Sequence, residues 1–235
     1  RPGAALGLGT ALTATGLALA RLADPRRTGV AVSLAAVIWA YDFWLKRTPA
    51  GPAAMSAARL LNVRLGADPG RPAEAAMPAA AVAAHTYLVT ALSRHEVTGT
   101  ARPAVPLATT AGTALIALAA GLRGTPAGTR SARLSPDLAP GTAPGLAPGQ
   151  AHWLAPRLAQ AALALAYASL FGAAQAAAIR DGSPRRVQQA VRSGILALIP
   201  LQGALVAGQG APATALAVVS LTGAAGPIFR RVSPT

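Results

Sequence analysis

The sequence has few charged residues and no cysteine. Charged residues make up 12% of the 235 residues, and only seven of them are acidic, against 21 that are basic. A soluble domain of this size carries about 25% charged residues. Without cysteine the chain forms no disulfide and no thiolate metal site. Its three histidines, His85, His95 and His152, are too scattered in the sequence to predict a zinc site. The scarcity of charge leaves two classes open, a protein with a large buried core or a membrane protein.

Long uncharged runs decide between these two classes. A helix needs about 20 apolar residues to cross the hydrocarbon region of a bilayer. The last of the runs is long enough for two spans, with a glycine- and proline-containing turn at 208–212. The sequence therefore predicts an all-α integral membrane bundle of about eight transmembrane or half-membrane helices. The uncharged runs are Gly3 to Ala20, Ala75 to Ser93, Pro103 to Leu122, Leu158 to Ile179 and Ser193 to Phe229.

One segment between the apolar runs differs from the others. Residues 124–152 repeat Ala-Pro-Gly-like units and show no apolar face, which predicts a flexible loop outside the bilayer. The sequence shows no repeat of the solenoid kind. We interpret residues 1–235 as a single transmembrane domain that contains this loop.

The net charge of +14 raises the question of nucleic acid. Many of the basic residues, however, stand in pairs between apolar runs, without interleaved aromatic residues. This pattern indicates anchors that meet lipid headgroups or acidic substrates, so no nucleic-acid partner is predicted. The side that holds Lys46, Arg94 and Arg186 carries slightly more basic residues than the other. The positive-inside rule therefore predicts a multi-pass protein of the cell membrane with this side in the cytoplasm.

A first polar cluster lies at the end of the second apolar run. Tyr41, Asp42, Lys46 and Arg47 precede a proline-containing break at 48–52. A helix end with lysine and arginine beside a loop could receive a diphosphate. The alternative is an aromatic belt with its usual basic flank at the membrane interface.

A second cluster lies in the short helix expected at Ala53 to Gly66. Arg59 and Asn62 are three residues apart, so they share one helical face. Polar groups inside a membrane are costly, and arginine is suited to bidentate binding of phosphate. The alternative is snorkelling of Arg59 to the interface and a helix–helix hydrogen bond for Asn62.

A third cluster, Arg94, His95 and Glu96, ends the run that begins at Ala75. A carboxylate beside arginine and histidine could help to hold a magnesium ion. The alternative is a solvated helix end. No phosphate-binding loop, dinucleotide fingerprint or catalytic triad accompanies these clusters.

Four stretches that include these clusters resemble the UbiA superfamily of intramembrane prenyltransferases, most closely its EboC branch. They are Tyr41 to Pro52, Met55 to Asn62, Leu92 to Gly99 and Gly194 to Leu201. The resemblance implies a helical bundle around a lateral cavity open to lipid, with Mg²⁺ as cofactor. Its substrates would be an isoprenoid diphosphate and an aromatic or lipid acceptor, and its activity that of an alkyl- or aryl-transferase.

The resemblance also implies roles for individual residues. Tyr41 and Lys46 would be catalytic, and Glu96 would be a metal ligand. The ions would neutralise the leaving diphosphate, and the apolar cavity would keep water from the allylic cation. The residues expected to bind the diphosphate are Lys46, Arg47, Arg59, Asn62 and Arg94.

The sequence departs from the family pattern in its acidic residues. The chain begins at Arg1 rather than Met, and we expect the first acidic motif, with one or two helices, to lie upstream. The second motif falls near Thr90 to Gly99, where Glu96 is the only acid, and Tyr41 and Lys46 are one residue further apart than in the family. Two functions remain open. One is a prenyltransferase, and the other is a non-catalytic membrane component that binds or helps export a hydrophobic metabolite.

Overall fold

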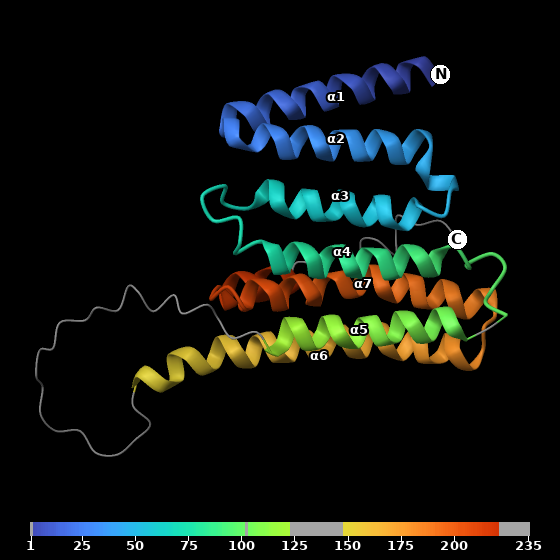
Figure 1. Cartoon of the computed structure of the whole chain (residues 1–235). Coiled ribbons are helices and arrows are strands. Elements are labelled where there is room, and N and C mark those ends of the chain that lie inside the picture. The colour runs from blue at the N-terminus through green and yellow to red at the C-terminus, as the bar shows by residue number, and fades with distance from the viewer. Residues whose placement is uncertain (1, 102, 123–147, 221–235) are drawn as a thin grey trace, which may run out of the picture.

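The structure is a bundle of helices that lie side by side (Figure 1). The computed structural model describes residues 2–101, 103–122 and 148–220, and no strand occurs within these ranges. The prediction of an all-α membrane bundle is confirmed. Among the residues that the structure describes, five helices are long and apolar enough to cross a membrane, namely Gly3–Ala23, Ala76–Ser93, Ala104–Leu122, Leu154–Arg180 and Pro184–Ala207.

Consecutive helices run in opposite directions, so the turns gather at two ends of the bundle (Figure 1). We call the end that holds η2, the α4–α5 turn and the α6–α7 turn the first end, and the end that holds η1 and the α3–α4 loop the second end. Residues 212–220, after α7, are also helical. The elements are α1 (Pro2–Ala23), η1 (Pro25–Arg27), α2 (Thr28–Phe43), η2 (Leu45–Arg47), α3 (Gly51–Gly66), α4 (Ala76–Ser93), α5 (Ala104–Leu122), α6 (Pro148–Arg180) and α7 (Pro184–Ala207).

Most of these helices begin and end near the expected breaks. Proline stands in the first turn of η1, α3 and α7, where its missing N–H would have no helical partner. Asp24 caps η1, because its carboxylate accepts a hydrogen bond of 2.9 Å from the backbone N–H of Arg26.

One boundary differs from the expectation. Helix α6 begins at Pro148 and so includes residues 148–152, which we had assigned to the flexible loop; proline at the first helical position lets the helix start there. The rest of that loop lies outside the described residues. Helix α2 ends at Phe43, and the following turn is the tighter η2.

The helices divide into a thin part and a thick part. Helices α1, α2 and α3 form a row one helix deep, whereas α4 to α7 pack around one another (Figure 1). The buried hydrophobic core comes from α4 to α7 together with Ala215. In contrast, α1 packs against α2, and the indole N–H of Trp39 donates to the Thr13 hydroxyl at 3.1 Å between them. The spanning segment of α1 has no buried residue.

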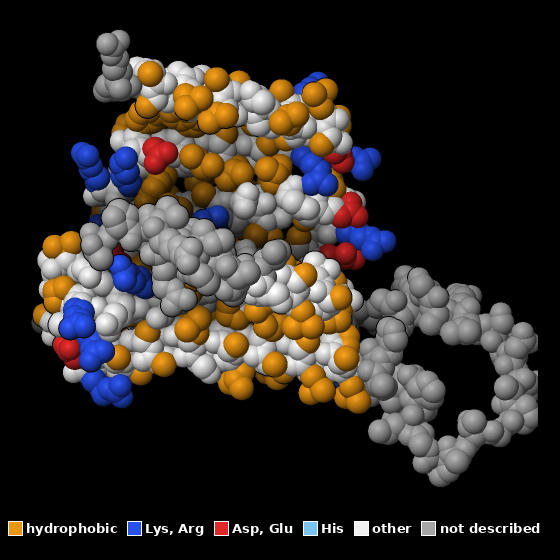
Figure 2. All heavy atoms as spheres, turned by 180° about the vertical axis from the view of Figure 1, so that it is seen from behind, with side chains coloured by type: hydrophobic (Ala, Val, Ile, Leu, Met, Phe, Trp, Pro, Cys, Tyr) orange, Lys and Arg blue, Asp and Glu red, His pale blue; other side chains and the backbone are white. Residues whose placement is uncertain are grey.

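The surface has the pattern expected of a protein in a bilayer. Apolar side chains cover the sides of the helices, and the charged side chains gather at the two ends (Figure 2). The sides would therefore face lipid tails, and the two ends would face the headgroups and water.

Two glycines let the turns of the first end approach each other closely. The backbone N–H of Thr100 donates to the carbonyl of Gly182 at 2.8 Å. A Cβ on Gly182 would lie 2.2 Å from the carbonyl oxygen of Thr100, and Gly99 has a φ of 71°. The α4–α5 and α6–α7 turns therefore depend on glycine at both positions.

Candidate functional site

Two adjoining grooves lie where the thin part of the bundle, α1 to α3, meets the thick part, α4 to α7. The groove between α2 and α3 has a volume of about 320 Å³, and the groove between α3, α4 and α7 has a volume of about 410 Å³. Tyr41, Met55 and Arg59 line both of them, so we treat the two as one site and call it the lateral groove. Because α1 to α3 form a single row, the groove between α2 and α3 opens at the side of the bundle, where lipid would lie.

Helical spacing places the lining residues on shared faces. On α3 the face consists of Met55, Ala58, Arg59 and Asn62, which occupy positions i, i+3, i+4 and i+7 of the helix. The facing side of α2 consists of Leu34, Ile38, Tyr41 and Asp42, which occupy positions i, i+4, i+7 and i+8. Each wall is therefore apolar for part of its length and polar for the rest.

The charged groups of the lateral groove do not neutralise one another in pairs. Arg59 and Asp42 are exposed along it, and Glu96 is half-buried at its edge near the first end. Within the described residues no ion pair joins Arg59 to either carboxylate. With one cation against two anions, the lining alone does not attract an anion.

The α4 wall supplies polar residues that the sequence interpretation missed. Thr86, Thr90 and Ser93 line the lateral groove, and each hydroxyl donates to a backbone carbonyl one turn earlier, at 2.8 to 2.9 Å. Hydroxyl oxygens that already donate can still accept a hydrogen bond. Their spacing of four and three residues within an uncharged run was the signal that could have revealed this face.

His85 also lines the lateral groove, although it is only 2% exposed. Its Nδ1 lies 3.2 Å from the hydroxyl oxygen of Tyr167, and its ring packs edge-on against Tyr167 and Phe171. A buried imidazole with a hydrogen-bond partner is satisfied within the core. His85 therefore forms a polar part of the groove floor and is held in place by α6.

The predicted site residues separate into two groups. The structure brings Tyr41, Arg59 and Asn62 together in one groove, and Tyr41, Arg59 and Glu96 in the other. Lys46 and Arg47 lie in η2 at the first end, where they are exposed and line neither groove.

Arg94 lies at the same end of the bundle and contacts the backbone instead of the groove. Its Nη1 donates to the carbonyl of Thr48 at 2.7 Å. This bond ties the end of α4 to the turn between η2 and α3. Arg94 therefore links the thin part of the bundle to the thick part.

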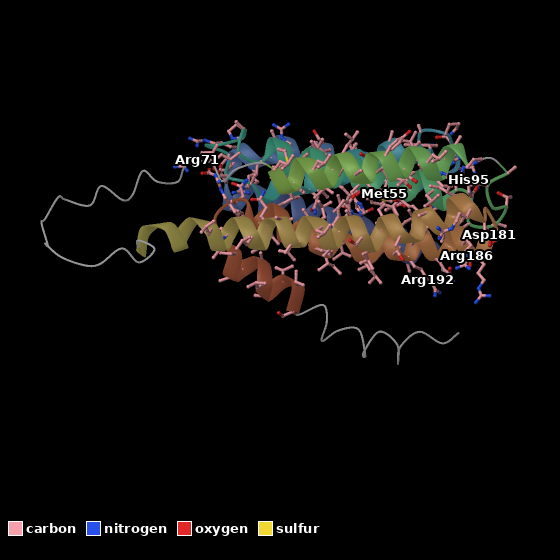
Figure 3. All side chains as sticks on the ribbon, turned by 90° about the horizontal axis from the view of Figure 1, so that it is seen from below. Met55, Arg71, His95, Asp181, Arg186 and Arg192 are labelled. Atoms are coloured by element: carbon pink, nitrogen blue, oxygen red, sulfur yellow. The ribbon has the colours of Figure 1, made fainter. Side chains whose placement is uncertain are left out.

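The first end also holds a small charged cluster at the α6–α7 turn. The Asp181 carboxylate accepts hydrogen bonds from the backbone N–H of Ser183 at 3.0 Å and from its hydroxyl at 3.1 Å, and it lies 3.6 Å from Nε of Arg186. The hydrogen bonds from Ser183, with a smaller contribution from Arg186, lower the pKa of Asp181. Figure 3 shows Asp181 and Arg186 with His95 at this end, far from Arg71 at the other.

The residues around the lateral groove do not by themselves form a magnesium site. Among the described residues, no group of three or more His, Cys, Asp or Glu side chains could hold a metal ion. Asp42 and Glu96 face adjoining grooves. Proteins often bind Mg²⁺ through one or two carboxylates together with substrate phosphates. The donor set therefore fits the ion only when a diphosphate supplies further oxygens.

No protein-family model, curated protein or solved structure matches the chain. The functional argument therefore rests on the fold, on the lateral groove and on the charges of its lining.

Proposed function

We propose that the protein binds a hydrophobic, lipid-like molecule with a polar head in the lateral groove. The observation that carries this proposal is the composition of the lining, in which apolar walls from four helices meet Tyr41, Arg59 and Asn62. The groove opens at the side of the bundle, so such a molecule could enter from the bilayer. Membrane sites of this kind are expected to be amphipathic, because a polar side chain among apolar ones is otherwise costly.

The polar head would determine which molecule binds. A hydrocarbon tail gains little by leaving lipid for an apolar groove, because lipid tails are as apolar as leucine side chains. A guanidinium and an amide, in contrast, offer several N–H donors that lipid tails cannot replace. Arg59 and Asn62 would therefore supply most of the selectivity, and Leu34 and Ile38 would contact the tail.

A second candidate function, prenyl transfer, follows from the resemblance to UbiA prenyltransferases. An isoprenoid diphosphate has an apolar tail and an anionic head, and Arg59 could bind its phosphate while Asn62 orients it. Because Asp42 and Glu96 outnumber Arg59, the lining would repel this head unless Mg²⁺ bound with it. Mg²⁺ would neutralise the diphosphate as it leaves, and the groove would keep water from the reacting carbon. Dependence on Mg²⁺ therefore separates transfer from simple binding of a metabolite for storage or export.

The same proposal includes an orientation in the cell membrane. The first end carries Lys46, Arg94 and Arg186, and we place it in the cytoplasm on the positive-inside rule. The part of the lateral groove that Tyr41, Asp42 and Glu96 line lies toward the first end and would then be nearest the cytoplasm.

A binding experiment with two probes tests the proposed function. The full chain is placed in lipid nanodiscs, and the affinities of farnesol and of geranyl diphosphate, the latter with and without Mg²⁺, are measured. Binding of farnesol without the ion supports a metabolite-binding component. Binding of geranyl diphosphate only with Mg²⁺ supports the transferase. If neither probe binds, the proposal fails.

The chain offers a matched control for the key arginine. Arg59 and Arg192 are each the ninth residue of their helix and both are exposed, but Arg192 does not line the lateral groove. Figure 3 shows Arg192 pointing away from the bundle. We expect Arg59→Gln to weaken binding of the bound probe about tenfold or more, because a hydrogen bond to a charged group contributes about 1.5–3 kcal/mol. Arg192→Gln should leave the affinity unchanged, and equal effects of the two substitutions would show that only overall charge matters.

A further inference from the structure

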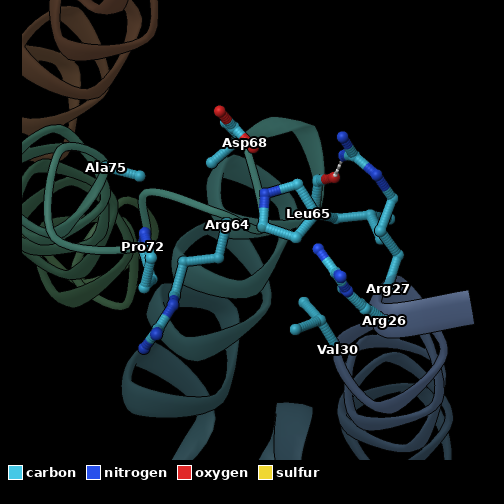
Figure 4. A pocket seen from close by; sticks show the side chains of 10 residues that line it. Arg26, Arg27, Val30, Arg64, Leu65, Asp68, Pro72 and Ala75 are labelled. Carbon is cyan, nitrogen blue, oxygen red and sulfur yellow. Dashed lines mark hydrogen bonds between the residues drawn. The ribbon is translucent and has the colours of Figure 1, made fainter. Parts of the chain in front are cut away.

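A second, smaller pocket lies at the second end of the bundle, where the turn before α2 meets the α3–α4 loop. Its volume is about 160 Å³, and Arg26, Arg27 and Arg64 line it together with Asp68. Figure 4 shows Arg26 and Arg27 extending from η1 toward Leu65, whereas Arg64 extends from α3 toward Pro72. Three arginine residues thus line one small pocket.

The acidic residues in and near this pocket have partners other than the side chains of Arg26 and Arg64. The carboxylate of Asp24 accepts from the backbone N–H of Arg26, and that of Asp68 accepts from the backbone N–H of Gly70 at 2.8 Å. Glu74 pairs with Arg71 at 3.5 Å, outside the pocket. Neither Arg26 nor Arg64 forms an ion pair within the described residues. Three positive charges therefore face a single negative one.

Arg27 is held in position for a ligand. One of its Nη atoms donates to the carbonyl of Leu65, which fixes the guanidinium between α2 and α3 (Figure 4). A guanidinium has five N–H donors. After this bond, the remaining donors of Arg27 are available to an acceptor in the pocket.

We propose that this pocket binds a phosphate group, most naturally that of an anionic lipid at the membrane surface. Arginine suits phosphate because its planar N–H groups match two phosphate oxygens at once. A bound anion would neutralise part of the positive charge of the three arginine side chains. The pocket lies beside the ends of α1, α2 and α3, where the headgroups would be, and Val30 and Leu65 give it an apolar side. This site is separate from the lateral groove and does not depend on the proposed function.

A titration with defined phosphate compounds tests this proposal. The full chain in an uncharged detergent is titrated with dioctanoyl phosphatidic acid, with dioctanoyl phosphatidylcholine and with inorganic phosphate, and the dissociation constant and the thermal midpoint are recorded. We expect phosphatidic acid to bind and to raise the midpoint, and phosphatidylcholine to bind much more weakly, because its choline group is cationic. Competition by inorganic phosphate would identify free phosphate as a ligand, and its absence would identify the lipid headgroup.

Substitutions in and beside the pocket separate specific binding from general attraction. The pair Arg26→Gln and Arg64→Gln should weaken phosphatidic acid about tenfold or more, since each removes a charge-assisted contact. Arg71→Gln removes an arginine of the same loop that lies outside the pocket, and it should change the affinity less than twofold. If the double variant does not fold, either single substitution provides the same comparison. Three results would overturn the proposal. Arg71→Gln could weaken binding as much as the pocket substitutions do, phosphatidylcholine could bind as tightly as phosphatidic acid, or no phosphate compound could bind at all.

Discussion

Replacing Gly194 by alanine should loosen the packing of α7 against α4 and α6. An added Cβ would lie 2.7 Å from Cγ2 of Val89 and 2.9 Å from Cε2 of Phe171. Phe171 is fully buried and packs against His85 with ring centroids 5.5 Å apart, so it has little room to move. The extra methyl group must therefore push α7 away or force a side chain from its preferred rotamer.

The cost of this substitution can be separated from the effect of alanine on the helix itself. Overpacking a well-packed site costs about 1–3 kcal/mol. Alanine favours a helix over glycine by about 1 kcal/mol, which offsets part of that cost. Gly172 on α6 provides the control, because nothing lies within 4 Å of the Cβ that it would gain. The helix term is common to both variants, so the free energies of unfolding should differ by the overpacking cost alone.

Thermal unfolding of the two variants in the same detergent measures this difference. In a chain of this size 1 kcal/mol shifts the midpoint by about 2–4 °C. The thermal midpoint of Gly194→Ala, measured by circular dichroism, should therefore lie about 2–12 °C below that of Gly172→Ala. Gly194 also stands close to residues that line the lateral groove, so the variant should bind the proposed ligand less tightly. If Gly194→Ala were as stable as Gly172→Ala, the close contact of α7 with α4 and α6 would not exist as described.

Three further predictions concern the two ends of the bundle. Gly182→Ala should lower the thermal midpoint, because its Cβ would meet the Thr100 carbonyl oxygen at 2.2 Å; an unchanged midpoint would contradict the contact between the two turns. The lowered pKa of Asp181 means that its ionised form stabilises the fold above the pKa of the unfolded chain, and that this stability is lost as the pH falls through the folded pKa. Asp181→Asn should accordingly lower the midpoint at neutral pH, and its difference from the unaltered chain should vanish in acid; a constant difference would contradict the cause. Because the chain has no cysteine, single Arg186→Cys and Arg71→Cys variants report orientation. In intact cells an impermeant maleimide should label the Arg71→Cys variant alone, and labelling of the Arg186→Cys variant alone would reverse the topology.

The arrangement of the helices could be predicted largely from uncharged runs and breaks. The run from Ala75 to Ser93 became α4 almost unchanged, because length and absence of charge are strong signals for a spanning helix. The start of α6 could not be predicted as well, since the sequence around Pro148 shares the composition of the segment before it. A proline there can end a loop or begin a helix, and composition alone does not distinguish the two.

The lateral groove was harder to predict than the helices. The shared face of Arg59 and Asn62 followed from their spacing, but the partners across the groove depend on which helices pack together. Lys46 and Arg94 belonged to the same predicted set because the family resemblance implied that both bind the diphosphate. The structure separates them from Arg59, since Lys46 is in η2 and Arg94 binds the Thr48 carbonyl. Position along the chain predicts depth in the membrane, but it does not predict the direction of a side chain.

Helix α3 connects the two proposed sites. It has 16 residues, with Arg59 and Asn62 facing the lateral groove and Arg64 facing the pocket at the second end. A free membrane helix with these residues would be unfavourable, because each polar side chain would lie among lipid tails. In the bundle, the first turn of α3 buries Gly51, Pro52 and Ala54, and later residues of the helix line the two hollows from different faces. The two proposed sites thus account for Arg59, Asn62 and Arg64 of α3, because each of these residues lines one of them.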